Sequence, residues 1–318
     1  MPVQFGVAIR NFVGPGETPD VEGLIRYAQR AEELGFESLW AWDHILLGVD
    51  PSFPVLDSLT ILTAIAVRTR RVRLGTGVMV LPLRNPVVAA KVLGTLDQIS
   101  NGRLLLGAAS GWYAREFDAV GISFKDRGRI FERNLDLLVR LWTEDFVTEQ
   151  VDELNLRSAV LLPKPVQKPH PPILIGGYID RVLRRTGRKG DGWLTYFYTP
   201  EGFTKSWAKV LEAAEKAGRD PSKLTATNQL AIYVGPPREE ADAPMRHWLS
   251  TEWDIAKWSD STIDHAIRGT VDECVEQLQA HVDAGVHRII LIPYRYQPEQ
   301  LEIIASEVIP KLTARAGT

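Results

Sequence analysis

Short apolar segments alternate along the chain with segments in which apolar residues recur every three or four positions. The first pattern is typical of buried β-strands and the second of amphipathic helices. Strands joined by helices form parallel sheets, and eight such units close into a barrel. We therefore predict an α/β fold, a (β/α)8 TIM barrel forming a single domain over residues 1–318, with strands over 3–9, 38–42, 72–81, 104–108, 173–176, 193–196, 225–234 and 288–292.

Cap and turn residues place helices between these strands. Thr18-Pro19 is expected to start the first helix, with the proline at its first position, and Gly35 to end it. Asn85-Pro86 is expected to start another helix in the same way. Further helices are expected over 57–70, 126–142, 179–188 and 200–218, and one more that ends at 284.

Two connections are longer than a barrel unit needs, and we interpret them as insertions. Residues 143–172, after the fourth strand, contain several prolines, which exclude a helix and favour a hairpin with a loop. Residues 235–268, after the seventh strand, carry a helical stripe of Met245, Trp248 and Leu249. Trp253 lies off this stripe, so its side chain is expected to form part of a pocket lid, a subunit contact or an ordinary packing contact.

Composition and charge narrow the classes of partner. The chain is 45% hydrophobic and 24% charged, and its apolar stretches stay shorter than the roughly 18 residues of a membrane span. A net charge of -3 leaves no basic excess to attract a nucleic acid. The single cysteine, Cys274, cannot form an internal disulfide, and no secretion signal is visible. We expect a cytoplasmic protein that acts on a small-molecule substrate.

Barrel enzymes place their reacting groups at the carboxyl ends of the strands. Asp43-His44 follows the second strand, where a histidine can exchange a proton near neutral pH and the carboxylate can adjust its charge. A structural histidine is the alternative, and the other histidines lie away from strand ends. The remaining polar or glycine residues at these ends are Arg10-Asn11, Thr76-Gly77, Ser110-Gly111, Gly176-Gly177, Tyr196, Asn228 or Gln229, and Tyr294-Arg295.

Glycine pairs mark two of the strand ends. Glycine weakens a strand unless the backbone must bulge or lie close to a ligand, so Gly75 and Gly77 together indicate one or the other. Gly176-Gly177 precedes a helix whose positive end suits a phosphate, although ordinary turn geometry explains both pairs equally well. No cluster of histidine and carboxylate residues suggests a metal, and a Gly-x-Ser-x-Gly motif is missing. An organic cofactor is therefore the remaining explanation for these polar and glycine-rich strand ends.

A series of motifs resembles the bacterial luciferase-like oxidoreductase superfamily, whose members bind FMN or the deazaflavin coenzyme F420 in a (β/α)8 barrel. The chain is most similar to the F420-dependent branch, which carries Asp-His after the second strand, as Asp43-His44 does here. The motifs occur in the family's order: 95–103 (TLDQISNGR), Gly111-Trp112 with Glu116-Phe117, Leu141-Trp142, 171–177 (PPILIGG) and 190–193 (GDGW).

The resemblance implies how the site is built. It implies a non-proline cis peptide bond at Gly77-Val78, forming a bulge that supports the coenzyme ring, with His44 beside the reactive ring. It places Asp43, Thr76, Ser110 and Arg115 at the cofactor as well, and the backbone of Gly176 and Gly177 at its phosphate. Residues expected to form the substrate pocket are Arg10, Trp40, Trp42, Phe53, Trp112 and Tyr196, although such aromatic side chains also serve as packing.

Three functions follow from the resemblance. The first is hydride transfer between the deazaflavin C5 and a small organic substrate, with His44 and Asp43 as the catalytic pair. The second is an FMN-dependent monooxygenase supplied with reduced flavin by a separate reductase, and the third a flavin-binding protein without turnover. A homodimer is expected. F420-dependent sugar-phosphate dehydrogenases carry a glutamate directly after the glycine where this chain has Trp112, so that substrate is not expected.

Overall fold

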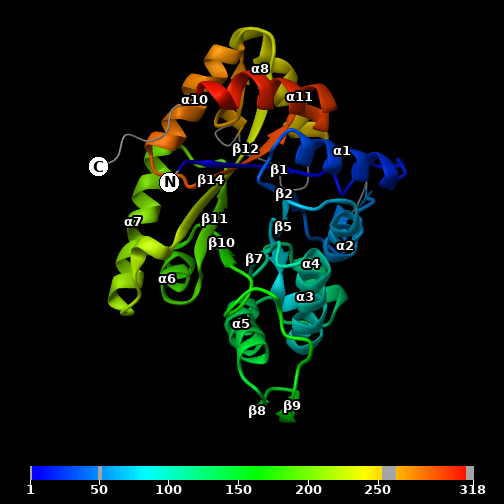
Figure 1. Ribbon diagram of the computed structural model, residues 1–318, viewed down its shortest axis with the longest axis vertical. Coiled ribbons are helices and arrows are strands. Elements are labelled where there is room, and N and C mark those ends of the chain that lie inside the picture. The colour runs from blue at the N-terminus through cyan, green and yellow to red at the C-terminus, as the bar shows by residue number, and fades with distance from the viewer. Residues whose placement is uncertain (1, 49–51, 253–262, 313–318) are drawn as a thin grey trace.

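Eight parallel strands close a barrel within the residues that the computed structural model describes, 2–48, 52–252 and 263–312 (Figure 1). Neighbouring strands pair in parallel around the barrel, and pairing of β10 with β7 closes it. The (β/α)8 prediction is confirmed. In barrel order the strands are β1 (Gln4–Ala8), β2 (Ser38–Ala41), β5 (Arg73–Thr76), β7 (Leu104–Ala109), β10 (Ile173–Gly176), β11 (Gly192–Tyr196), β12 (Thr225–Val234) and β14 (Arg288–Pro293).

Helices surround the barrel and follow its strands in sequence (Figure 1). Asn85 caps α3 as expected, because its side chain accepts from the N–H of Val87. The predicted start of α1 is wrong: the carboxylate of Asp20, not Thr18, accepts from the N–H of Gly23 at 2.8 Å and caps the helix. The helices are α1 (Val21–Glu33), α2 (Ser58–Arg68), α3 (Pro86–Ser100), α4 (Ala114–Ala119), α5 (Arg127–Thr143), α6 (Asp180–Lys189), α7 (Pro200–Lys216), α8 (Arg238–His247), α10 (Val271–Asp283) and α11 (Pro298–Ile303).

The third barrel strand is interrupted by a bulge. It was expected to be continuous, but β5 ends at Thr76 and a short strand, β6 (Met79–Val80), resumes the pairing with β7. Residues 76–78 stand opposite only two residues of β7, since Gly75 pairs with Leu105 and Met79 with Ala108. A Cβ on Gly107 would lie 2.1 Å from the Thr76 carbonyl oxygen, so the bulge requires a glycine on the neighbouring strand.

Alternate residues of the barrel strands belong to two packed groups. One group, including Leu39 and Leu106, packs with the surrounding helices, and the other, including Trp40 and Leu105, fills the barrel interior. Trp40 is 1% exposed, its indole N–H donates to Ser38 Oγ, and its ring occupies the space beside Gly75. The expectation that Trp40 lines a substrate pocket is therefore wrong, because this side chain belongs to the core.

The two insertions lie after the fourth and seventh barrel strands, as predicted. The first forms a hairpin of β8 (Val147–Val151) and β9 (Leu154–Ala159), at the foot of Figure 1. The second contains α8 and a short strand, β13 (Ile267–Gly269), which pairs with β12. Met245, Trp248 and Leu249 are buried, whereas Trp253 lies outside the described residues. None of the helices in the described ranges has the length and apolar character needed to cross a membrane.

His281 makes the stability of α10 sensitive to acid. Its side chain is buried, and burial lowers the pKa of the imidazole to about 4 from its usual 6.5. Between these values the unfolded chain binds the proton and the folded chain does not, so stability falls as the pH drops. We expect the free energy of unfolding to fall by about 2 kcal/mol between pH 7 and pH 5 in the wild type, and by less in His281→Leu.

Urea unfolding at the two pH values measures this difference. His247→Asn is the matched control, because His247 is exposed and its replacement should leave the pH dependence unchanged. An equal pH dependence in His281→Leu and the wild type would show that other groups cause the acid sensitivity.

Candidate active site

Asp43 ties the end of β2 to the third strand. Its buried carboxylate accepts from Ser58 Oγ at 2.7 Å, from the Val80 N–H at 2.9 Å and from the Arg84 guanidinium at 2.6 Å. Within the described residues no hydrogen bond joins Asp43 to His44. Asp43 therefore does not act on His44 through a hydrogen bond, and its expected effect on the charge of His44 stays a prediction. A contact between Asp43 and the cofactor stays a prediction.

Glu116 of α4 holds His44 instead. Its side chain is 1% exposed, and its Oε2 lies 3.1 Å from His44 Nδ1. The other oxygen, Oε1, accepts from the N–H groups of Ile45 and Leu46 at 2.6 and 3.2 Å. Because a carboxylate only accepts, Nδ1 of His44 carries a hydrogen, and in the neutral ring Nε2 is free of one. The sequence motif contained Glu116, but only the fold brings it to His44.

The loop after β7 covers one side of His44. The ring of Trp112 meets the His44 imidazole edge to face, with ring centroids 6.1 Å apart, and Trp112 is 46% exposed. Arg115 donates to the Gly48 carbonyl at 3.0 Å, which links α4 to the loop after β2. Ser110 is half-buried at the start of the same loop. The expected cofactor roles of Ser110 and Arg115 stay predictions.

The peptide bond between Gly77 and Val78 is cis, so the conformation implied by the resemblance is confirmed. The Gly77 N–H donates to the Ala41 carbonyl at 2.8 Å, which places the bulge next to the strand that leads to His44. Thr76 directs its hydroxyl to the Gly107 carbonyl, at 2.7 Å. The side chain of Thr76 therefore joins β5 to β7, and its expected contact with the cofactor stays a prediction.

Residues Gly77, Val78, Ala109 and Gly176 lie together at the carboxyl ends of the strands, and we call this surface the floor of the barrel mouth. A Cβ on Gly176 would lie 3.0 Å from Val78 Cγ1 and 3.4 Å from Ala109 Cβ, so glycine lets these strand ends approach closely. Gln229 of β12 lies opposite Gly77, and neither atom of its buried amide has a hydrogen-bond partner among the described residues. A narrow floor with an unpaired polar group fits a flat heteroaromatic ring.

Gly177 continues this floor toward α6. Its φ of +137° favours glycine, and within the described chain the N-terminus of α6 has no side-chain cap. These features agree with the predicted phosphate contact, which stays a prediction. Two basic residues of α6 form ion pairs with the neighbouring helix α5: Arg185 lies 3.0 Å from Glu132, and Lys189 lies 2.6 Å from Asp136.

An aromatic groove of about 410 Å³ opens where β10 and β11 end. Tyr178 meets Tyr196 edge to face at 5.0 Å and stacks on Tyr198 at 5.6 Å, measured between ring centroids. His265 also lines this groove, and its Nδ1 donates to the Phe197 carbonyl at 2.8 Å. His265 was not predicted as a site residue, because it lies away from the ends of the barrel strands. The structure instead brings it to Tyr196, an expected pocket residue.

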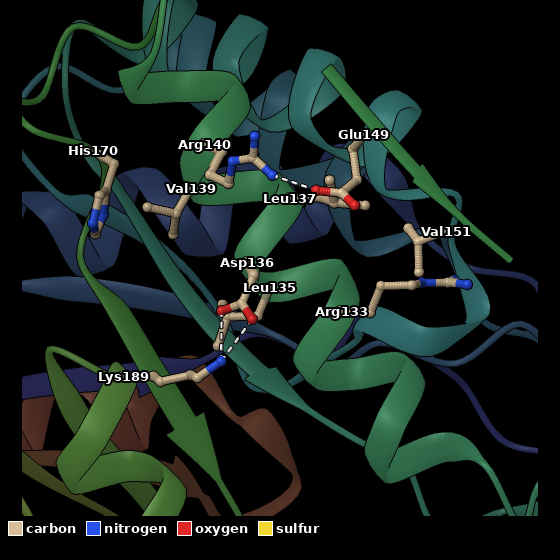
Figure 2. Close-up of a pocket in the computed structure, with 10 residues that line it drawn as sticks. All are labelled: Arg133, Leu135, Asp136, Leu137, Val139, Arg140, Glu149, Val151, His170 and Lys189. Carbon is tan, nitrogen blue, oxygen red and sulfur yellow. Dashed lines mark hydrogen bonds and ion pairs between the residues drawn. The ribbon is translucent and has the colours of Figure 1, made fainter. Parts of the chain in front are cut away.

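A larger cavity of about 550 Å³ lies elsewhere, on α5 (Figure 2). Its wall includes His170, Val139 and Glu149, and ion pairs from Lys189 to Asp136 and from Arg140 to Glu149 cross it (Figure 2). None of the sequence-predicted site residues lines it. The cavity with the expected chemistry is therefore the smaller one, at the strand ends.

Three other expected pocket residues follow strands at the same end of the barrel. Arg10 is half-buried and approaches Glu17 at 3.4 Å. Phe53 is buried in the short hairpin that pairs β3 (Leu47–Gly48) with β4 (Ser52–Phe53). Trp42 is half-buried, and its indole N–H donates to the Tyr296 hydroxyl at 3.2 Å. Their contacts with a substrate stay predictions.

Known proteins resemble this chain over almost its whole length. It is 30% identical over 316 residues to the F420-dependent glucose-6-phosphate dehydrogenase of Amycolatopsis mediterranei (strain U-32), covering 92% of this chain and 94% of the relative. It is 28% identical to the 4-hydroxyprotoasukamycin monooxygenase of Streptomyces nodosus subsp. asukaensis, over 87% of this chain and 81% of the relative. The crystal structure of monooxygenase RslO1 from Streptomyces bottropensis superposes with a TM-score of 0.83 at 26% identity, covering 96% of this chain and 99% of RslO1.

A family model described as luciferase-like monooxygenase matches residues 1–288. The match spans seven barrel strands completely and begins the eighth, β14, at Arg288. It therefore includes His44, Glu116, the Gly77-Val78 bulge and Gln229. The resemblance seen in the sequence motifs is confirmed, and the chain belongs to the luciferase-like monooxygenase family.

Proposed function

We propose that this protein is an oxidoreductase that uses coenzyme F420 to transfer a hydride to or from a small organic substrate. The observation that carries the proposal is His44, held by Glu116 at the end of the strand, β2, whose Ala41 carbonyl accepts from Gly77 of the Gly77-Val78 bulge. The relative with 30% identity is named as an F420-dependent dehydrogenase. The small groups of Gly77, Val78, Ala109 and Gly176 leave a floor for a flat ring.

His44 is the proton partner in this reaction. When bound, the coenzyme supplies the carbon atom, C5, that gives or receives the hydride. Glu116 keeps a hydrogen on Nδ1 of His44, so Nε2 accepts the proton that a substrate hydroxyl loses on oxidation and returns it on reduction. Trp112 contacts the imidazole and shields one side of it from water.

The substrate that we propose is not a sugar phosphate. F420-dependent dehydrogenases of that kind carry an acid directly after the glycine of the β7 loop, where this chain has Trp112. The groove formed by Tyr178, Tyr196 and Tyr198 favours an apolar or aromatic molecule instead. The Tyr196 hydroxyl stays protonated and able to donate, because burial raises the pKa of Tyr196.

Titration with F420 and with FMN, each alone, tests the choice of coenzyme. Tryptophan fluorescence reports binding, and ring absorbance reports reduction or oxidation. We expect tight binding and turnover with F420. Tight FMN binding without a response to F420 would contradict the proposal.

An FMN-dependent monooxygenase served by a separate reductase is the second candidate. Two of the similar proteins are named monooxygenases, which favours this alternative over other flavin chemistry. Oxygen uptake that requires FMN and an added flavin reductase would support it. Binding of either coenzyme without any turnover over a substrate screen would support the third candidate, a non-catalytic flavin-binding protein.

We also propose a homodimer in the cytoplasm. An exposed apolar stripe along α3, formed by Val88, Val92 and Ile99 with Val67 of α2 nearby in the fold, supports an association between copies. The only cysteine, Cys274, is buried, as suits a reducing compartment.

A further inference from the structure

Gln229 has a buried side-chain amide that forms no hydrogen bond within the described part of the fold. It lies on β12 at the same level as Tyr196, with which it pairs across the β11–β12 ladder, and it is 1% exposed. Its backbone carbonyl accepts from the Phe197 N–H at 2.8 Å. Its side-chain amide makes no hydrogen bond to any described residue, through either Oε1 or Nε2.

Burying an amide without partners is unfavourable, and native proteins leave few such groups. Gln229 could be replaced by an apolar residue of similar size at no cost to the contacts around it, so the fold alone does not account for it. Gln229 differs in its position from another buried polar group that has no hydrogen-bond partner among the described residues. Thr227, two residues earlier on the same face of β12, also has an unpaired hydroxyl, but it lies lower in the barrel, opposite Arg288.

The position of the amide points to the coenzyme-binding floor. The nearest atoms to a Cβ built on Gly77 would be Oε1 and Nε2 of Gln229, at 3.5 and 3.6 Å. These are ordinary contact distances, so packing would accept alanine at position 77. The Gln229 amide therefore lies directly beside the Gly77-Val78 bulge, at the edge of the proposed ring site.

We propose that Gln229 binds the imide edge of the coenzyme ring through two hydrogen bonds. A carboxamide presents a donor, Nε2, beside an acceptor, Oε1. That pair is complementary to an adjacent C=O and N–H on a cyclic imide, the group at the pyrimidine end of both deazaflavins and flavins. The proposal rests on the proposed function. It is independent of the choice between F420 and FMN, because both rings carry this edge.

Gln229→Met tests the proposal, since methionine has a similar length and no hydrogen-bonding amide. We expect the dissociation constant of the coenzyme that the wild type binds to rise at least about tenfold, a loss of about 1.4 kcal/mol. The Tm of the ligand-free protein should rise by about 2 °C, because an unpaired polar group has been removed from the interior. Thr227→Val is the matched control, with a similar rise in Tm and unchanged binding.

Three further measurements make the result decisive. Gln229→Asn withdraws the same amide by one methylene, so it should also weaken binding and serves if the methionine variant fails to fold. Methylation of the ring at N3 should weaken binding to the wild type and have little effect on Gln229→Met. Wild-type binding tests the proposed function, whereas the ratio of variant to wild type tests the role of Gln229.

Several outcomes would overturn the assignment. An unchanged dissociation constant in folded Gln229→Met or Gln229→Asn excludes the contact. A Tm that falls together with affinity shows that the amide supports the fold rather than the ligand. An equal penalty for N3 methylation in both proteins excludes the imide edge as the group that Gln229 binds.

Discussion

His44→Ala is expected to lower kcat about 10²- to 10³-fold while the coenzyme still binds with nearly the affinity of the wild type. The imidazole is the group at the end of β2 that can exchange a proton at neutral pH, and Glu116 and Trp112 hold it in place. Floor residues such as Val78 and Gly176 are untouched by the substitution, so ring binding should persist. Single-turnover absorbance of the coenzyme measures the chemical step, and fluorescence titration measures binding.

Glu116→Gln is the matched variant for this test. Its remaining carbonyl oxygen still accepts from the N–H groups of Ile45 and Leu46, so the loop should keep its shape. Its new NH₂ group donates to Nδ1 of His44 and thereby moves the imidazole hydrogen to Nε2. We expect kcat to fall in this variant too, without a change in Tm beyond that of His44→Ala. Turnover by His44→Ala at the wild-type rate would remove His44 from the reaction.

Asp43→Ala is expected to lower the free energy of unfolding by about 3 kcal/mol. The substitution leaves the partly buried guanidinium of Arg84 without its nearest carboxylate and the Val80 N–H without an acceptor. The connection between β2 and the third strand is lost with them. Urea unfolding with a shared m-value measures the change, and coenzyme binding should weaken because the bulge loses its support.

Asp57→Asn provides the control for Asp43. Asp57 also pairs with Arg84, at 3.1 Å, but its side chain is 43% exposed, and asparagine can still cap α2. The cost should therefore stay below about 1 kcal/mol. If Asp43→Ala is as stable as the wild type but inactive, Asp43 acts on the reacting groups directly and not through its structural contacts.

The alternation of strands and helices was sufficient to predict the barrel, because each unit carries its own local signals. Asn85-Pro86 and Gly35 mark helix ends through contacts within a few residues, so these positions are readable from sequence. Asp20 was missed because three residues in a row, Thr18, Pro19 and Asp20, all suit a helix start. Only the geometry of the cap decides among them.

The site residues that the sequence patterns misplaced or did not identify share a physical cause. Strands of a parallel barrel are buried on both faces, so alternation in sequence does not show which residues face the interior, as Trp40 and Gln229 do. The partner of His44 is 72 residues away, and the adjacent carboxylate, Asp43, points to Arg84. His265 reaches the groove from an insertion rather than from a strand end. Each of these depends on contacts between distant segments.

The bulge in the third strand also limits how this chain can change over generations. The Thr76 carbonyl occupies the place where any side chain on Gly107 would begin. A mutation at position 107 therefore displaces the bulge, although residue 107 itself need never touch a ligand. Substitutions at positions 76 and 107 are therefore coupled. We expect changes in substrate preference to arise more readily in the loop at Trp112 or the groove at Tyr196 than in this strand.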